Sequence, residues 1–511
     1  MQNRKPRAGH TSPDSGAAAP WTPRYAENLL AECQAPPGRA PIRAIPSRAL
    51  DSAREWARSG AMALTGEAEG PPRLAPGPLA SVARGAALAL AALAPGSRSL
   101  AELDGPALLG ERAALMQLER RGAIAPGGGC RLIAARDAWL ALNLARPEDR
   151  DLLPAWLEAE PAPGEDAWNF AARVLRRRSM RGCVERGRMM GLAVAPALGA
   201  PATEAPWLRA ESVGPRRPPP RPGERPQVLD LSALWAGPLC AQLLGSSGAR
   251  VIKLESRDRP DGARRGEPRF FDLLNAGKQS VAVDLGQQAG IRRLRELIAC
   301  ADIVVESARP RALLQFGIDP SACLHARPGQ VWVSITAYGR RGAQGNWAGF
   351  GDDVAMAAGA GVDAGVGADA GESTGEARRP ATHGEAPVFC GDAIADPLTG
   401  LHAAVAALAR WQTGRGALLD ISLYAVTRSA LAAGREGASP PEIQPRVEAA
   451  SAPNAAPNPA PNPKANWRVV TANGSENVAA PRARAPRGRA AALGADNAGA
   501  SFDARAATRS P

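Results

Sequence analysis

Asp396 is the residue of this chain whose type and setting best suit covalent chemistry. It lies in the segment GDAIADPLTG (391–400), between Gly391 and Gly400. A carboxylate can attack a thioester carbonyl and form a mixed anhydride. Backbone N–H groups in a glycine-flanked loop can stabilise the oxyanion of that attack, and exclusion of water would protect the anhydride. The segment therefore predicts a nucleophilic carboxylate.

The same segment has a structural interpretation. Asp is a favoured N-cap of helices and Pro is favoured at the first helical position, so Asp396-Pro397 also predicts the start of an Ala-rich helix. Both roles are compatible, because a carboxylate at a helix start faces backbone N–H groups. The pattern alone leaves both open.

An internal repeat sharpens this prediction. Residues 80–94 (ASVARGAALALAALA) align without a gap with residues 395–409 (ADPLTGLHAAVAALA), and Gly85 faces Gly400. The counterpart of Asp396 is Ser81, which cannot act as a carboxylate nucleophile. The repeat therefore predicts a duplicated helix with one active site per chain.

The elements around this site predict an α/β fold. Short apolar runs alternate with helical patterns between residues 227 and 340, which is typical of a Rossmann-like parallel sheet with helices on both faces. The expected strands are 228–231, 250–254, 280–285, 302–306 and 331–336. Ligands bind at the carboxyl ends of such strands. The first strand is not followed by GxGxxG, which disfavours a nicotinamide or flavin dehydrogenase.

Composition predicts how the chain is divided. A Pro/Arg-rich stretch separates two folded parts, and both ends are rich in Ala, Pro, Arg, Asn and Ser without apolar periodicity. We expect a disordered tail (1–49), a unit with a smaller α+β domain (50–205), a linker (206–226), the Rossmann-like catalytic domain (227–429) and a low-complexity, disordered C-terminal tail (430–511).

Several classes of function are disfavoured. The net charge is +12, but much of the excess lies in the tails and linker and no nucleic-acid-binding motif accompanies it. The seven cysteines form no CxxC pair and the four histidines do not cluster, so no metal site is expected. The longest apolar run, 86–94, is far shorter than the ~20 residues of a membrane span. With no secretory signal pattern, a cytoplasmic protein without membrane or nucleic-acid partners is expected.

At this point the residues resemble family III CoA-transferases, which include formyl-CoA transferase, carnitine CoA-transferase and the related α-methylacyl-CoA racemase. The matching segments follow the family's order: VLDLSALWAGPLCAQLLGSSGARVIKLE (228–255), FFDLLNAGKQSVAVDL (270–285), ADIVVESARPRALLQFGI (301–318), VWVSITAYGRRG (331–342), GDAIADPLTGLHAAVAAL (391–408) and TGRGALLDISL (413–423). The first half resembles a second, incomplete family unit, in SGAMALTGEAEGPP (59–72), CRLIAARDAWLALNLARPEDRDLLPAWL (130–157) and MMGLAVAPALG (189–199).

The resemblance implies a function and a set of site residues. Asp396 would attack an acyl-CoA, and the released CoA would then form an enzyme-CoA thioester that passes CoA to a carboxylic acid acceptor. Coenzyme A is thus the substrate and no metal is implied. Members form interlocked dimers, so a homodimer or a monomer mimicking that dimer is expected. The implied CoA-binding residues are Ala236, Arg265, Asn275, Ala276, Gly277, Lys278, Ser307, Ala308, Thr336, Tyr338 and Gly339.

Departures from the family pattern keep two alternatives open. Trp235, Ser307, Ala308 and Gln315 replace residues common in the transferases, which leaves room for a non-catalytic CoA-binding homologue. A racemase needs a second proton-transferring group, generally a histidine in an AGHD-like segment. Here that segment reads AGFGD (348–352), without histidine, which favours transfer.

Overall fold

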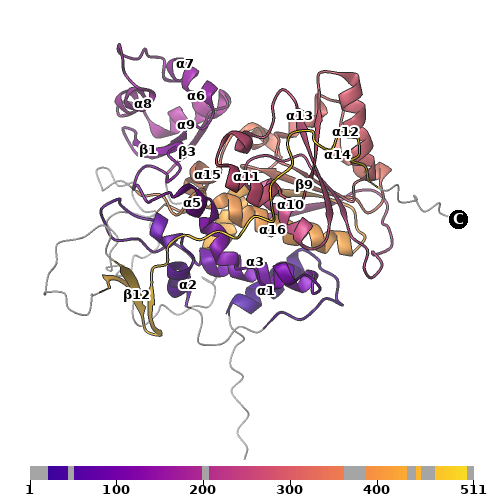
Figure 1. The fold of residues 1–511 in the computed structure, drawn as a ribbon. Helices are drawn as coiled ribbons and strands as arrows, with labels where there is room; N and C mark the ends of the chain where they lie inside the picture. The colour runs from indigo at the N-terminus through magenta and orange to yellow at the C-terminus, as the bar shows by residue number, and fades with distance from the viewer. Residues whose placement is uncertain are drawn as a thin grey trace, which may run out of the picture.

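A seven-stranded sheet forms the centre of the fold (Figure 1). The computed structural model describes residues 21–43, 51–197, 206–361, 387–433, 445–450 and 466–502. In spatial order the strands are β4 (Leu208–Ser212), β10 (Ala417–Ser422), β9 (Val331–Thr336), β8 (Ile303–Glu306), β5 (Gln227–Asp230), β6 (Arg250–Ser256) and β7 (Gln279–Val283). The strands from β10 to β7 are parallel, and β4 pairs antiparallel with β10.

The strand order has a switch point between β5 and β8. From β5 the chain runs outward through β6 and β7, and then returns to place β8, β9 and β10 on the other side. This is the doubly wound order of a Rossmann fold, in which the crevice at the switch point is the usual ligand site. The predicted Rossmann-like sheet is confirmed.

Helices cover both faces of this sheet. One face packs against α10 (Ala236–Ser246) and α16 (Ala395–Gln412), and the other against α12 (Gln288–Cys300) and α14 (Pro320–Ala326). β8 reads IVVE and is buried throughout, as a parallel strand covered on both faces must be. Further elements are η4 (Gly262–Arg265), α11 (Pro268–Asn275), α13 (Pro310–Leu314), η5 (Gly342–Asn346), α15 (Gly351–Ala357) and α17 (Leu423–Ala432).

The expected smaller α+β domain lies in the first half of the chain. Its antiparallel sheet has the order β1 (Cys130–Ala134), β2 (Trp139–Asn143) and β3 (Ala193–Pro196). Four helices surround a separate apolar core with Trp156 and Phe170 at its centre: α6 (Pro147–Asp151), α7 (Leu153–Leu157), α8 (Ala167–Leu175) and α9 (Met180–Met189). In Figure 1 this domain projects from the main body beside α15.

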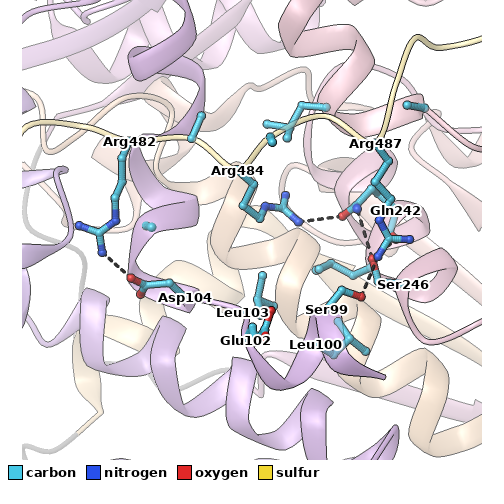
Figure 2. A pocket seen from close by; sticks show the side chains of 16 residues that line it. Ser99, Leu100, Glu102, Leu103, Asp104, Gln242, Ser246, Arg482, Arg484 and Arg487 are labelled. Atoms are coloured by element: carbon cyan, nitrogen blue, oxygen red, sulfur yellow. Dashed lines mark hydrogen bonds and ion pairs between the residues drawn. The ribbon is translucent and has the colours of Figure 1, made fainter. Parts of the chain in front are cut away.

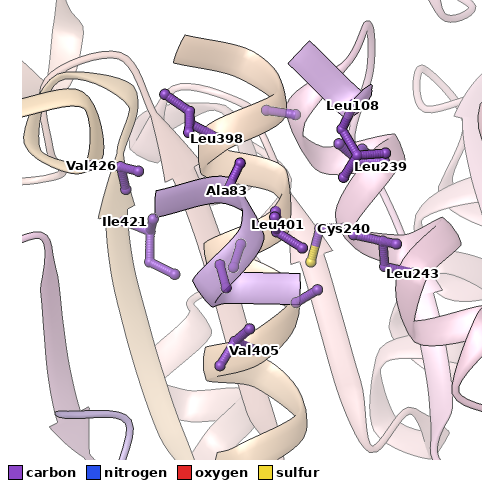
Figure 3. Packing of buried hydrophobic residues seen from close by; sticks show 14 of the residues in the cluster. Ala83, Leu108, Leu239, Cys240, Leu243, Leu398, Leu401, Val405, Ile421 and Val426 are labelled. Carbon is purple, nitrogen blue, oxygen red and sulfur yellow. The ribbon is translucent and has the colours of Figure 1, made fainter. Parts of the chain in front are cut away.

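The two repeated segments meet in one core. The first copy forms α3 (Leu79–Leu93), the second forms α16, and the two helices contact each other. Figure 3 shows Ala83 of α3 among Leu398, Leu401 and Val405 of α16, with Leu239 and Cys240 of α10 alongside. The first half of the chain therefore shares its main apolar core with the Rossmann-like domain. Its other helices are α1 (Trp21–Glu32), α2 (Ser52–Arg58), η2 (Met62–Leu64), α4 (Arg98–Ala101), η3 (Gly105–Gly110) and α5 (Glu111–Met116).

Three expected unstructured stretches contain ordered elements. The linker 206–226 begins with β4, which covers the open edge of β10 and removes its unpaired backbone groups. The N-terminal tail contains α1, which buries Leu29 and Leu30 against α3. The C-terminal tail contains a hairpin-like sheet of β11 (Arg446–Ala449), β12 (Trp467–Thr471) and β13 (Gly474–Asn477), followed by an extended segment. Residues 1–20, 44–49, 434–444, 451–465 and 503–511 of these tails lie outside the described residues.

That extended segment, residues 479–500, is called the C-terminal strap below. Near its start, Arg482 pairs with Asp104 and Arg484 pairs with the fully buried Glu111, both in the first half of the chain. Figure 2 shows Arg482, Arg484 and Arg487 reaching from the strap toward α4, η3 and α10 around a pocket of about 310 Å³. Toward its end, Asn497 accepts a hydrogen bond from the backbone N–H of Ala282 on edge strand β7 (2.8 Å). The strap thus joins the first half of the chain to the far edge of the sheet.

Candidate active site

Asp396 lies in the first turn of α16, one residue after the helix begins. The N-cap is Ile394, and α3 likewise begins at Leu79, before Ser81. The prediction that Asp396 caps its helix is therefore wrong, because α16 extends further toward the amino end than the Asp-Pro pattern suggests. Capping does not occupy the Asp396 carboxylate.

The surroundings of Asp396 favour its protonated form. Its side chain keeps some solvent access, but withdrawal from water and the neighbouring carboxylates Asp352 and Asp392 raise its pKa to about 7. Two groups act in the opposite direction: the guanidinium of Arg112 and the backbone N–H of Gly351. A carboxyl that is half ionised near neutral pH is a better-matched nucleophile than an ordinary surface aspartate, because it is less well solvated.

The turn before Asp396 is conformationally strained. Ala393 has φ +44°, a left-handed conformation that costs a non-glycine residue energy. Two contacts hold it: the backbone N–H of Ala393 donates to Asp352 (2.8 Å), and that of Gly391 donates to Thr65 (2.8 Å). Thr65 belongs to the first half of the chain. Such strain persists only where neighbours fix it, which is typical of functional sites.

Four aspartates gather around this turn with one arginine. Arg112, from α5 in the first half, makes a two-pronged ion pair with Asp392, with its Nε 2.8 Å from Oδ2. Burial and the charge of Asp392 raise the pKa of Asp352 to about 6. Burial raises that of Asp353 to about 7, although Asp353 accepts hydrogen bonds from Phe350 and from Asn143 of β2. Ionisation of one carboxyl group opposes ionisation of its neighbours, so groups packed this closely are not all ionised at the same time.

This cluster adjoins the switch point of the sheet. Gly400, one turn along α16 from Asp396, packs against α10, and a Cβ at Gly400 would lie 2.6 Å from the carbonyl oxygen of Ala236. Ala236 is the first residue of α10, directly after the loop that follows β5. Arg112 stacks over the indole of Trp235 in that loop, with its Cζ 5.3 Å from the ring centre. Asp396 thus lies one helical turn along α16 from the residue that contacts the start of α10.

Most of the expected CoA-binding residues lie along that carboxyl edge. Ser307 and Ala308 follow β8, Thr336 ends β9, and Tyr338 and Gly339 come directly after it. The Ser307 hydroxyl accepts a hydrogen bond from the N–H of Ala233 (3.0 Å), which ties the loops after β8 and β5 together. Arg265 ends η4, in the loop after β6, and is exposed. Their roles toward CoA stay predictions.

Aromatic contacts cover Tyr338. Its buried ring lies edge-on to Trp347, 5.4 Å between centres, and Arg188 of the smaller domain stacks over both rings. Burial raises the pKa of the Tyr338 hydroxyl above its usual value. These contacts make Tyr338 part of the joint between the smaller domain and the sheet.

The loop from Asn275 to Lys278 reaches the carboxyl edge from the side of β7. It precedes that strand, but β7 starts level with the end of β5, since Ser280 pairs with Lys253 and Lys253 with Asp230. Lys278 is buried, and its Nζ donates to Asp230 (2.8 Å), Pro238 (2.9 Å) and Asn275 (2.9 Å). An ammonium has three donors, so these contacts use them all. The Lys278 ammonium is therefore saturated by protein acceptors, and the roles of Asn275, Ala276, Gly277 and Lys278 toward CoA stay predictions.

Sequence reasoning missed Arg112 and the role of the other aspartates. Arg112 stands in the unremarkable run ERAALM of α5, and no spacing links it to Asp392, 280 positions away. Asp352 entered only as the end of the AGFGD segment. Within α16, His402 is fully enclosed, bonded to Tyr25 (2.8 Å) and to the carbonyl of Leu398 (2.7 Å), and is therefore not placed to transfer protons beside Asp396. The other histidine near Asp396 in the sequence, His383, lies outside the described residues.

The described part of the chain holds neither a metal-binding cluster nor a membrane-spanning helix. No group of three or more His, Cys, Asp or Glu side chains there is arranged to hold a metal ion. No described helix is both long and apolar enough to cross a membrane.

Comparison with known proteins gives a consistent set of relatives. The chain is 31% identical over 213 residues to succinyl-CoA–D-citramalate CoA-transferase of Chloroflexus aurantiacus, covering 40% of this chain and 50% of that protein. It is 32% identical over 214 residues to succinyl-CoA:glutarate CoA-transferase of Mus musculus, covering 40% and 45%. The chain thus spans about half the length of the curated relatives it matches.

One solved structure and one family pattern complete the comparison. A CAIB/BAIF family protein from Brucella suis is 30% identical, over 40% of this chain and 54% of that one, with a TM-score of 0.33. The sequence pattern of CoA-transferase family III matches residues 226–507, more than half of the 511 residues. The matched range begins just before β5 and includes α15, the Asp396 turn and the C-terminal strap. The chain belongs to CoA-transferase family III.

Proposed function

We propose that this chain is an acyl-CoA:carboxylate CoA-transferase with Asp396 as its nucleophile. The observation that carries the proposal is the setting of Asp396, a carboxyl with a pKa of about 7 that follows a strained turn and lies one helical turn before the contact of Gly400 with the start of α10. The relatives named as succinyl-CoA CoA-transferases support this reaction class for a family member.

The proposed reaction has two halves. An Asp396 oxygen attacks the thioester carbonyl, a C–O bond forms, the C–S bond breaks and CoA leaves as thiolate. The thiolate then attacks the carbonyl of Asp396 in the anhydride, which releases the first acid as carboxylate and leaves an enzyme-CoA thioester. An acceptor carboxylate reverses these steps, so that its acyl group leaves as the new CoA thioester and Asp396 is regenerated.

The protein contributes by positioning the reacting groups and by excluding water. Gly351 lets the Asp396 carboxylate sit against its backbone, and the loops after β5, β8 and β9 form the edge at which CoA would bind. Asp352, with a pKa raised to about 6, and Asp353 can hold protons near the reacting carboxylate. The acyl group would enter from the side of the smaller domain, which packs against α15.

Exchange of labelled CoA tests the proposal. The purified chain is incubated with radiolabelled CoA thioesters and a panel of unlabelled mono- and dicarboxylic acids. Label in a new thioester, absent with Asp396→Asn, is the expected result. Loss of α-deuterium from a branched acyl-CoA without label exchange would indicate a racemase. CoA binding by the wild-type chain without any label exchange would indicate a non-catalytic CoA-binding homologue and overturn the proposal.

A further inference from the structure

The Arg112–Asp392 ion pair is the charged contact of the first half of the chain with the active site, beside the hydrogen bonds made by Thr65 and Asn143. Arg112 is one-quarter exposed, Asp392 is fully buried, and two donors of the guanidinium engage both carboxylate oxygens. This fork fixes the guanidinium plane as well as its charge. Its other face stacks on Trp235 at the switch point, so Arg112 cannot shift without breaking one of these contacts.

The charges around Asp396 show what this pair controls. α15 contributes Asp352 and, next to it, Asp353; the 391–394 turn contributes Asp392; and α5 contributes Arg112. Among these groups Arg112 is the one cation facing several carboxyls. Without it, Asp392 would add an uncompensated negative charge within four residues of Asp396. Two neighbouring carboxylates oppose each other's ionisation.

We propose that Arg112 is a positioning residue of the reaction: by neutralising Asp392 and fixing the 391–396 turn, it keeps Asp396 able to ionise among the other carboxyls. This inference rests on the proposed function for its catalytic consequence. It also assigns a task to the first half of the chain, which supplies Arg112 and Thr65 to a turn in the second half. Asp396 is then poised only when both halves are docked.

The test compares Arg112→Gln with a matched variant. Arg84→Gln breaks a similar ion pair, to the fully buried Glu55, and Arg84 is 27% exposed against 24% for Arg112. In Arg112→Gln the acid limb of kcat/KM should move up by about one pH unit, and activity near pH 6 should fall about tenfold more than activity near pH 9. Arg84→Gln should leave the limb in place. Arg112→Gln combined with Asp392→Asn should bring the limb back.

A second readout does not depend on turnover. The unfolding free energy of Asp396→Asn minus that of its parent, followed against pH, reports the ionisation of Asp396 in the folded chain. This difference should level off near pH 7 in the wild-type background and about one unit higher in the Arg112→Gln background. If the difference levels off at the same pH in both backgrounds, the inference is overturned.

The two readouts distinguish failure of the inference about Arg112 from failure of the proposed function. If transfer activity survives Asp396→Asn, Asp396 is not the nucleophile and the proposed function fails. The pH dependence of stability would then still decide whether Arg112 controls the ionisation of Asp396. Asp396-dependent transfer with an unmoved acid limb in Arg112→Gln would remove the role of Arg112 alone.

Discussion

Gly351 lies directly against the carboxylate of Asp396. A Cβ built at Gly351 would be 2.2 Å from Oδ2 of Asp396 and 2.5 Å from the carbonyl oxygen of Ala393. Both are well inside van der Waals contact, and neither neighbour is the free end of a long side chain. The start of α15 and the Asp396 turn therefore fit together only with glycine at this position.

Gly351→Ala should accordingly abolish activity. The methyl group would displace the Asp396 carboxylate or the 393–396 turn, with an expected loss of stability of about 2 kcal/mol from overpacking. Gly182→Ala is the control, since a Cβ there meets nothing within 4 Å and Ala is the better helix former. It should keep full activity and gain a few tenths of a kcal/mol in urea unfolding. A fully active Gly351→Ala enzyme would contradict this geometry.

Lys278 and Arg265 should respond in opposite ways to substitution. Lys278→Met leaves the buried Asp230 without its ion-pair partner and should cost about 3 kcal/mol of stability, as other broken buried pairs do. Arg265→Gln, at an exposed position, should leave the unfolding midpoint unchanged and raise KM for the CoA thioester several-fold. Urea unfolding together with KM measurements checks both. A normal KM in Arg265→Gln would remove Arg265 from the CoA site.

Lys278 shows which features of the fold can be predicted from the sequence and which cannot. The strand pattern and segment order predicted the sheet, the carboxyl edge and Asp396, because each depends on local periodicity or on contiguous motifs. The role of Lys278 depends on what its side chain meets across the fold, at Asp230, 48 positions away. The Arg112–Asp392 pair spans a still longer separation, and no local pattern records it.

The tails show a second limit, set by composition. An Ala/Pro/Arg-rich strap has no periodicity of its own, so it predicted disorder. In the structure its order comes from long-range pairs such as Arg484 with Glu111 and from hydrogen bonds to edge strand β7. Likewise, α1 is ordered because α3 offers a face for Leu29 and Leu30.

Arg484→Leu should therefore weaken the whole fold. It strands the fully buried carboxylate of Glu111 and removes a hydrogen bond to Gln242 of α10. We expect a loss of about 3 kcal/mol in the free energy of unfolding. The control is Arg487→Leu, an exposed position bonded to the Ser99 hydroxyl, which should change stability by less than about 0.5 kcal/mol. Equal effects of the two variants would show that the strap is not anchored through Glu111.

The buried His402 should make the free energy of unfolding depend on pH. Burial lowers its pKa to about 4, so the folded state disfavours the imidazolium relative to the unfolded chain, whose histidine has its usual pKa near 6.5. The contribution of neutral His402 is complete above pH 6.5, declines as the pH falls toward 4 and is constant below that. Over this window it amounts to about 3 kcal/mol. His402→Gln should lack this slope in unfolding experiments between pH 4 and 6.5, and an unchanged slope would contradict the buried neutral form.

Transfer of carboxylate oxygen tests the central claim, nucleophilic attack by Asp396, most directly. The enzyme is turned over with an acyl-CoA donor and an acceptor acid labelled with oxygen-18 in its carboxylate. The mass of the peptide that contains Asp396 is then measured by mass spectrometry. Passage through the anhydride predicts that heavy oxygen from the acceptor enters the Asp396 carboxylate. The same experiment on Asp396→Asn should show neither turnover nor label. Turnover of the wild-type enzyme without heavy oxygen in this peptide would contradict the account.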